Sequence, residues 1–220
     1  MIGIFGGTFD PPHLGHIHLI ESILERFNFS KLYLVPNYQN PLKTKGPTVT
    51  PENRLLLLKT AIQGLDSRIE ILDWEIKNQG PSYTIDTVKH VKTLHSEPIS
   101  VVIGNDLFSQ LPEWKSAAEL FQLVDWIVIK RNEGIVLEPQ QLLNKIGIFD
   151  SHFSEKNHLA YRQNQRSIRF CDIQALPFSS TRIREELGEL WKKNKLEDPP
   201  QGIQRSVWLM IKEKRLYTVG

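Results

Sequence analysis

Two histidines stand where the first helix of the chain is expected to begin. The stretch GGTFDPPHLGH, residues 6–16, follows the apolar run MIGIF and precedes an apolar pattern with helical spacing. His13 and His16 are three residues apart, so a helical turn places them on one face. Protonated side chains oppose the helix dipole there by about 0.3–1 kcal/mol each. The pair is therefore explained best by an anion bound between the imidazoles; the alternative is a neutral pair exposed to solvent.

The glycines of this stretch fit the same chemistry. Gly6 and Gly7 allow a sharp turn and a close approach of a ligand to the backbone, and Gly15 lies between the histidines. In an open α/β fold, ligands bind at the carboxyl ends of strands, beside helix N-termini. The order strand, turn and helix start puts GGTFDPPHLGH at such a place.

A second candidate helix start carries cations as well. PFSSTRIREEL, residues 177–187, places the capping residues Ser179, Ser180 and Thr181 before Arg182 and Arg184. Hydroxyls, helix N–H groups and guanidinium groups together are typical of a phosphate site. The two stretches predict one polyphosphate held between two helix N-termini.

Predicted strands and helices alternate along the chain, and these elements must position the residues of the two stretches. Apolar runs predict strands at residues 1–5, 31–36, 68–76, 99–103, 126–131 and 167–173. Helical spacing and capping residues predict helices near 17–27, 51–64, 83–95, 116–123, 181–190 and 203–214. This alternation indicates an α/β fold, a Rossmann-like open and largely parallel sheet with helices on both faces. We expect a single domain over residues 1–220, with residues 132–166 as an irregular insertion or long connection.

Composition narrows the class of protein. The 220 residues are 40% hydrophobic and carry a formal charge of only +2, which indicates no broad nucleic-acid surface. The single cysteine, Cys171, excludes an internal disulfide and suits a reducing compartment. Since no apolar run approaches eighteen residues, we expect a cytoplasmic protein without a membrane partner. A homo-oligomer is compatible with the sequence.

GGTFDPPHLGH together with SSTRIR resembles the nucleotidylyltransferase superfamily with its H-x-G-H signature. Between them, PSYTIDT from Pro81 and GNDLFSQLPEW from Gly104 resemble the bacterial nicotinate-nucleotide adenylyltransferases. The resemblance covers most of the chain outside residues 132–166. It implies adenylyl transfer from ATP to nicotinate mononucleotide, giving nicotinate adenine dinucleotide and pyrophosphate, with Mg²⁺. Such a reaction depends on positioning and charge stabilisation, which agrees with the absence of an obvious nucleophile–base pair.

The resemblance also implies a role for each matching residue. It makes His13 and His16 catalytic, with His16 stabilising charge at the α-phosphate. It assigns ATP binding to Gly6, Gly7, Thr8, Phe9, Gly15, Gly104, Asp106, Ser180, Thr181 and Arg184. It assigns the nicotinate nucleotide to Lys43, Ser82, Tyr83, Thr84, Trp114 and Lys115. No residue is expected to bind the metal directly, and Asp106 would face the ATP ribose or the water shell of the metal.

One position departs from the family pattern. Family members commonly carry a histidine in the stretch that reads Pro41-Leu42-Lys43 here, and the apolar Leu42 cannot donate to a phosphate. Two alternatives stay open at this point. One is a pantetheine-phosphate adenylyltransferase, whose chains are usually shorter and which PSYTIDT and GND…PEW do not suit. The other is a non-catalytic nucleotide-binding sensor, which the loss of one of the two histidines would favour.

Overall fold

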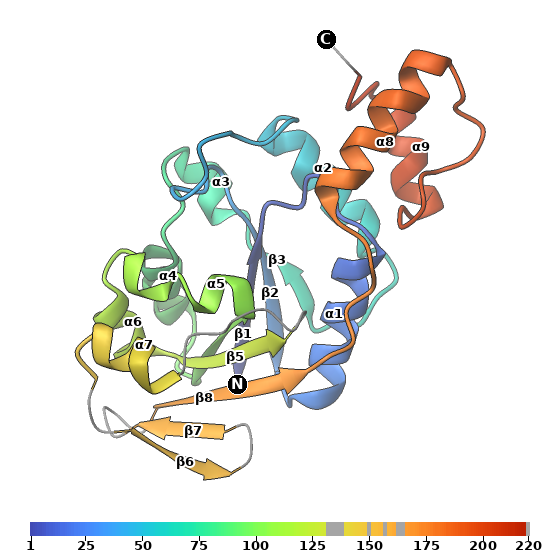
Figure 1. The fold of residues 1–220 in the computed structure, drawn as a ribbon. Coiled ribbons are helices and arrows are strands. Elements are labelled where there is room, and N and C mark those ends of the chain that lie inside the picture. The colour runs from blue at the N-terminus through green and yellow to red at the C-terminus, as the bar shows by residue number, and fades with distance from the viewer. Residues whose placement is uncertain (131–138, 149–150, 156–157, 162–165, 219–220) are drawn as a thin grey trace. The chain divides into compact units, whose positions relative to one another are not determined.

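The computed structural model describes residues 1–130, 139–148, 151–155, 158–161 and 166–218 (Figure 1). The chain divides into two compact units, each built from three segments that are distant in sequence. Unit 1 contains Met1–Gly6, Asn28–Leu34 and Ser82–Gln174, and unit 2 contains Gly7–Phe27, Val35–Pro81 and Ala175–Gly220. The expected single domain stays a prediction, and each unit is described by itself.

Unit 1 is built on a sheet whose strands, apart from β6 and β7, follow the predicted apolar runs. Its strands lie in the order β2-β1-β4-β5-β8-β7-β6. β1 pairs in parallel with β4, β4 with β5, and β5 with β8, whereas β7 pairs antiparallel with β8 and β6 pairs antiparallel with β7. Buried apolar residues face one another across this register, so the parallel part forms the core of the unit. The strands are β1 (Ile2–Gly7), β2 (Lys31–Pro36), β4 (Ile99–Gly104), β5 (Asp125–Lys130), β6 (Ser151–Glu155), β7 (His158–Tyr161) and β8 (Arg166–Asp172).

Short helices connect these strands. α4 (Thr84–Leu94) precedes β4, while α5 (Asn105–Phe108), a 3₁₀ turn (Leu111–Glu113) and α6 (Ala117–Leu123) lie between β4 and β5. Residues 132–166 also contain α7 (Pro139–Lys145) and the hairpin strands β6 and β7. The expectation of an irregular segment is therefore wrong for these three elements, whose short length gives only weak periodicity. The rest of that segment lies largely outside the described residues.

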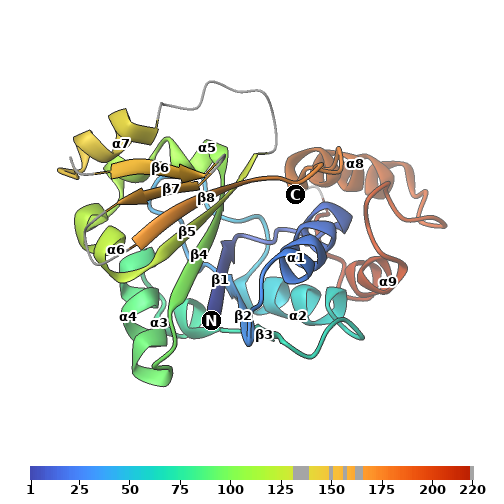
Figure 2. The same ribbon diagram turned by 90° about the horizontal axis from the view of Figure 1, so that it is seen from below.

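Unit 2 is mainly helical. It contains α1 (Leu14–Arg26), α2 (Pro51–Ala61), β3 (Ile69–Ile71), α3 (Trp74–Asn78), α8 (Ser180–Lys193) and α9 (Arg205–Glu213). α1 buries the predicted apolar stripe of Ile17, Ile20 and Leu24. The side chain of Thr50 caps α2 by accepting a hydrogen bond from the Asn53 N–H at 3.4 Å. Figure 2 shows α1, α2 and α9 beside one another within this unit.

The predicted strand over residues 68–76 is mostly wrong, because only β3 is extended and α3 begins at Trp74. Aspartate is depleted in strands and common at helix starts. Here the Asp73 carbonyl accepts the Lys77 N–H at 3.0 Å, and the two side chains form an ion pair at 2.9 Å. Residues four apart lie side by side on a helix, so this ion pair is one that α3 allows and an extended strand does not. Within the described ranges, no helix is both long and apolar enough to cross a membrane.

Candidate active site

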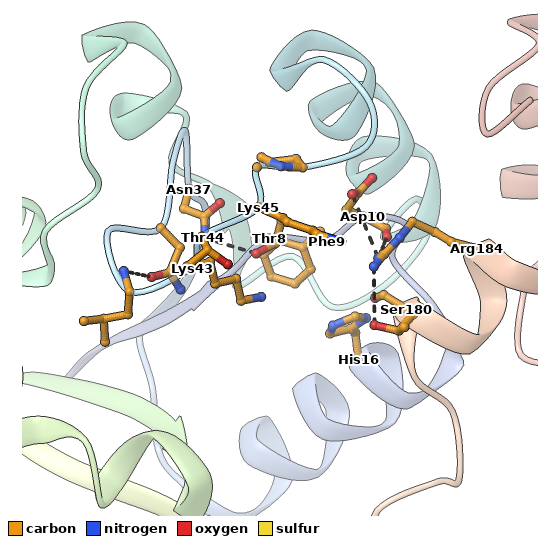
Figure 3. A pocket seen from close by; sticks show the side chains of 15 residues that line it. Thr8, Phe9, Asp10, His16, Asn37, Lys43, Thr44, Lys45, Ser180 and Arg184 are labelled. Carbon is orange, nitrogen blue, oxygen red and sulfur yellow. Dashed lines mark hydrogen bonds and ion pairs between the residues drawn. The ribbon is translucent and has the colours of Figure 1, made fainter. Parts of the chain in front are cut away.

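A pocket of about 590 Å³ lies within unit 2, in the size range of sites that hold nucleotide-sized ligands. Three stretches line it: the turn after β1 together with His16, the loop from Asn37 to Pro47, and the start of α8. Figure 3 shows His16 rising from α1 and Ser180 and Arg184 from α8, with Lys43 and Thr44 on the loop across the pocket. Ser180, Thr181 and Arg184 all line the pocket, so both predicted helix starts contribute to one site.

The two histidines form the N-terminal cap of α1. His13 is the capping residue, and His16 occupies the third helical position. The His13 N–H donates to Nδ1 of His16 at 3.2 Å, as a glutamate or glutamine side chain does in a capping box. Because His13 is only 8% exposed, the alternative of a solvent-exposed pair is wrong for this residue.

This cap fixes the protonation pattern of His16. A ring nitrogen that accepts a hydrogen bond carries no proton, so the proton of neutral His16 sits on Nε2 as a donor. The imidazole rings lie 3.8 Å apart between centroids. The first turn of α1 contains no acidic residue, which leaves its positive end available to an anion.

Two glycines make room for aromatic rings of the site. A Cβ at Gly15 would lie 3.0 Å from Nδ1 of His13, and one at Gly7 would lie 2.9 Å from Cζ of Phe9. Gly7 was expected to let a ligand approach the backbone. The Phe9 side chain fills the space that a Cβ at Gly7 would take, and its ring lies 5.1 Å from the ring of His16 between centroids. The ATP-binding role of Gly7 stays a prediction. Phe9 also has a φ of 49°, a left-handed conformation that costs a bulky residue about 1–3 kcal/mol.

The start of α8 is tied to the turn after β1. The Ser180 hydroxyl donates to the Pro11 carbonyl at 3.0 Å. Nη1 of Arg184 donates to the Asp10 carbonyl at 2.6 Å, and Nη2 donates to the Thr181 hydroxyl at 3.3 Å. These bonds hold the hydroxyls and the guanidinium of α8 at the same pocket as His16.

Sequence reasoning missed Asp10, a buried carboxylate at the centre of these contacts. Its Oδ1 accepts the Tyr217 hydroxyl at 2.9 Å, and its Oδ2 accepts the Thr48 N–H at 2.6 Å. Nη1 of Arg184 lies 3.9 Å from Oδ2. Burial, and then the charge of Asp10, raise the pKa of Tyr217 above its ordinary value. The hydroxyl therefore stays protonated and donates to the carboxylate.

Arg54 was missed as well. It is fully buried on α2, and its guanidinium donates to the carbonyls of Thr8 at 2.9 Å and Tyr38 at 3.3 Å. Burial lowers the pKa of Arg54, and the negative charge of Asp10 opposes that shift. The sequence did carry a signal for Arg54. Its helical spacing places it on the same buried face of α2 as Leu57, Leu58 and Ala61. A charged residue in such a stripe needs buried partners.

The loop across the pocket adds polar and cationic side chains. Asn37 anchors it, since its N–H donates to the Gly7 carbonyl at 3.0 Å and its Nδ2 donates to the Thr8 hydroxyl at 3.2 Å. The predicted Lys43 lines the pocket, and so does Lys45, which was not predicted. Leu42, at the position of the missing family histidine, is 42% exposed and lines the pocket too.

The remaining predicted residues belong to unit 1. There Nζ of Lys115 lies 4.4 Å from the centre of the Tyr83 ring and 2.9 Å from the Asp86 carboxylate. Trp114 packs edge-on against Trp126, with 6.2 Å between ring centroids. The other predicted residues of this unit are Gly6 in β1, Ser82 and Thr84 at the start of α4, Gly104 at the end of β4, and Asp106 in α5. Their binding roles stay predictions.

Comparison with known proteins identifies the family. A family model described as cytidylyltransferase-like matches residues 4–186. A probable nicotinate-nucleotide adenylyltransferase of Geobacillus thermodenitrificans is 37% identical over 170 residues, which cover 77% of this chain and 78% of that protein. One of the same name from Clostridium novyi is 33% identical over 186 residues, covering 84% and 86%. The chain belongs to the nicotinate-nucleotide adenylyltransferase family.

A solved structure shows that the fold is shared. The structure of Plasmodium falciparum nicotinic acid mononucleotide adenylyltransferase complexed with NaAD covers 98% of this chain and 96% of its own, with a TM-score of 0.69 and 20% identity. The prediction of an open, largely parallel Rossmann-like sheet is thereby confirmed. Membership of the adenylyltransferase family also confirms the resemblance on which the site residues were chosen.

Proposed function

We propose that this adenylyltransferase transfers the adenylyl group of ATP to nicotinate mononucleotide. A phosphate oxygen of the mononucleotide attacks the α-phosphorus of ATP and forms a new P–O bond. The bond between the α-phosphorus and the bridging oxygen breaks, and pyrophosphate leaves with that electron pair. The products are nicotinate adenine dinucleotide and pyrophosphate, as required for NAD biosynthesis.

The observation that carries this proposal is the meeting of two helix N-termini at one pocket. His16 from α1 and Ser180, Thr181 and Arg184 from α8 line it together. Neither helix has an acidic residue in its first turn, so both present the positive end of the dipole. We assign the Nε2–H of His16 to the α-phosphate, where charge develops, and the α8 residues to the β- and γ-phosphates. His13 holds His16 in this role through the 3.2 Å capping bond.

Mg²⁺ would enter as the complex with ATP. Among the residues that the structure describes, no three His, Cys, Asp or Glu side chains are grouped as metal ligands. Asp10 lines the pocket, but both of its carboxylate oxygens already accept hydrogen bonds. Mg²⁺ commonly keeps several waters and binds substrate phosphates. The metal would therefore neutralise phosphate charge while this chain orients the triphosphate, with Asp106 as the candidate that faces the metal's water shell or the ribose.

The second substrate is assigned to Lys43 in the pocket loop and to the α4 and Trp114 regions of unit 1. Trp114 would stack on the pyridine ring, and main-chain N–H groups near Thr84 and Lys115 would bind its carboxylate. The Lys115 ammonium, held by Asp86 at 2.9 Å, is less able to pair with the ligand itself. We therefore assign discrimination between nicotinate and nicotinamide to the main-chain donors, which suit a carboxylate and oppose the NH₂ of an amide.

An acceptor panel tests the proposal. The purified protein is mixed with Mg²⁺ and ATP, and pyrophosphate is measured with nicotinate mononucleotide, with phosphopantetheine or with no acceptor. Pyrophosphate that depends on nicotinate mononucleotide supports the proposed reaction. Pyrophosphate only with phosphopantetheine would favour the pantetheine-phosphate enzyme, and ATP binding without turnover would favour a sensor.

A further inference from the structure

Tyr217 is a buried hydroxyl that the proposed reaction does not use. It lies after α9, is 6% exposed and does not line the pocket. Its hydroxyl donates to Oδ1 of Asp10 at 2.9 Å, although the two residues are 207 positions apart in sequence. A buried hydrogen bond to a charged group is among the stronger polar contacts in a protein. This bond connects the last part of unit 2 to the turn that lines the pocket.

Asp10 is held on more than one side. The Thr48 N–H donates to its Oδ2 at 2.6 Å, so the carboxylate also fixes the end of the pocket loop. The guanidinium of Arg184 lies 3.9 Å from Oδ2 and donates to the Asp10 carbonyl at 2.6 Å. One buried carboxylate thus connects Tyr217, the loop and the cation assigned to the ATP phosphates.

The residue before Asp10 needs such an anchor. Phe9 has a left-handed φ of 49°, which a bulky side chain keeps only where its surroundings enforce it. The centroid of the Phe9 ring lies 5.1 Å from the centroid of the His16 ring, and Phe9 lines the same pocket as His16. If the turn relaxed, Phe9 would move, and the contact between its ring and the His16 ring would change.

We propose that Tyr217 and Asp10 are positioning residues for ATP binding, an inference that rests on the proposed function. Tyr217 orients the Asp10 carboxylate, and Asp10 keeps both the strained turn at Phe9 and the guanidinium of Arg184 in place. Tyr217 itself touches no substrate. Its contribution to ATP binding passes through Asp10.

Two variants separate the hydrogen bond from the charge. Tyr217→Phe removes the hydroxyl and leaves the carboxylate. Asp10→Asn removes the charge, while its amide oxygen can accept the Thr48 N–H and its NH₂ can donate to the Tyr217 hydroxyl oxygen. Tyr33→Phe is the matched control, because it removes a hydroxyl that lies 2.9 Å from Nε2 of His95 in unit 1. Network changes of this kind typically alter binding roughly two- to thirtyfold. We expect the affinity for ATP to fall by this factor in both variants and to stay unchanged in the control.

The readout is the melting temperature of each protein without ligand and over a series of MgATP concentrations, which yields a dissociation constant for ATP. A purely structural role would lower the melting temperature without ligand and leave that constant unchanged. The inference is overturned if Tyr217→Phe binds ATP as tightly as the unmodified protein. If Tyr217→Phe does not fold, the inference is overturned by an Asp10→Asn variant that binds ATP as tightly as the unmodified protein. No response of the unmodified protein to MgATP would instead contradict the proposed function and, with it, the inference.

Discussion

The main-chain N–H of His13 donates to Nδ1 of His16 at 3.2 Å, so the second histidine completes the helix cap that the first begins. This bond leaves Nε2 as the nitrogen of His16 that carries the proton. A neutral imidazole does not oppose the helix dipole, and its N–H can still donate to an anion. The two histidines at the start of α1 therefore share a capping role, and the free Nε2–H of His16 suits the phosphate-binding role that we propose for it.

Removal of the His16 side chain should reduce turnover more than substrate binding. A preorganised donor that acts on charge in the transition state contributes roughly 10²–10³-fold to kcat. We expect His16→Ala to show that loss in steady-state kinetics, with smaller changes in KM. His16→Gln keeps a capping side chain and should fold well but stay impaired. Near-normal turnover in His16→Ala would contradict the role assigned to this residue.

A methyl group at Gly15 should disturb the same site. The added Cβ of Gly15→Ala would lie 3.0 Å from Nδ1 of His13, so the buried ring must move. We expect a drop in kcat and a loss of about 1–3 kcal/mol in the free energy of unfolding. Gly80→Ala is the control, since its nearest neighbour would be 3.9 Å away. Equal behaviour of the two variants would show that His13 does not need this space.

Two neighbouring arginines of α8 should differ in their effect on ATP. Arg184 lines the pocket and is fixed by the Asp10 carbonyl, whereas Arg182 is exposed and does not line it. Loss of a charge-assisted contact with phosphate costs about 1.5–3 kcal/mol, or roughly ten- to hundredfold in affinity. Arg184→Ala should therefore raise KM for ATP by that factor with little change for the mononucleotide. Arg182→Ala should resemble the unmodified protein; a similar rise in both would argue against this assignment.

Alkaline pH should weaken the fold through Tyr217. Burial and the charge of Asp10 raise the pKa of Tyr217 in the folded protein above its ordinary value of 10.0. The stabilising contribution of its neutral hydroxyl is therefore complete below pH 10 and is lost as the pH rises further, by up to about 1.4 kcal/mol per unit. Denaturant unfolding between pH 8 and 11 should show a steeper loss for the unmodified protein than for Tyr217→Phe. Parallel curves would mean that this tyrosine does not titrate as expected.

Most strands and helices could be predicted from the sequence, because they depend on the types and spacing of residues that are close together in the chain. The strand at Lys31 and the helix at Pro51 begin where the apolar run and the capping residues predict. The strand predicted over residues 68–76 was too long, because its second half forms α3. The ion pair between Asp73 and Lys77 forms at helical spacing and not in an extended strand, so the alternating apolar pattern gave no sign of it. The elements within residues 132–166 are too short for their periodicity to be distinguished from that of loops.

The site was predicted where one motif holds several of its residues and missed where it depends on contacts between distant residues. His13, His16 and Gly15 stand together in one stretch, so their spacing was informative. Tyr217 and Thr48 lie far from Asp10 in sequence, and only the folded chain brings them to its carboxylate. The segments of unit 2 meet through such bonds, which composition and periodicity do not encode.

The fate of the α-phosphorus of ATP tests the central proposal most directly. Protein, Mg²⁺ and nicotinate mononucleotide are incubated with ATP that carries an isotopic label on the α-phosphate, and the products are separated. Adenylyl transfer predicts that the label moves into nicotinate adenine dinucleotide in a one-to-one ratio with the pyrophosphate released. Label that stays in ATP, or that appears in AMP or ADP without dinucleotide, would contradict it.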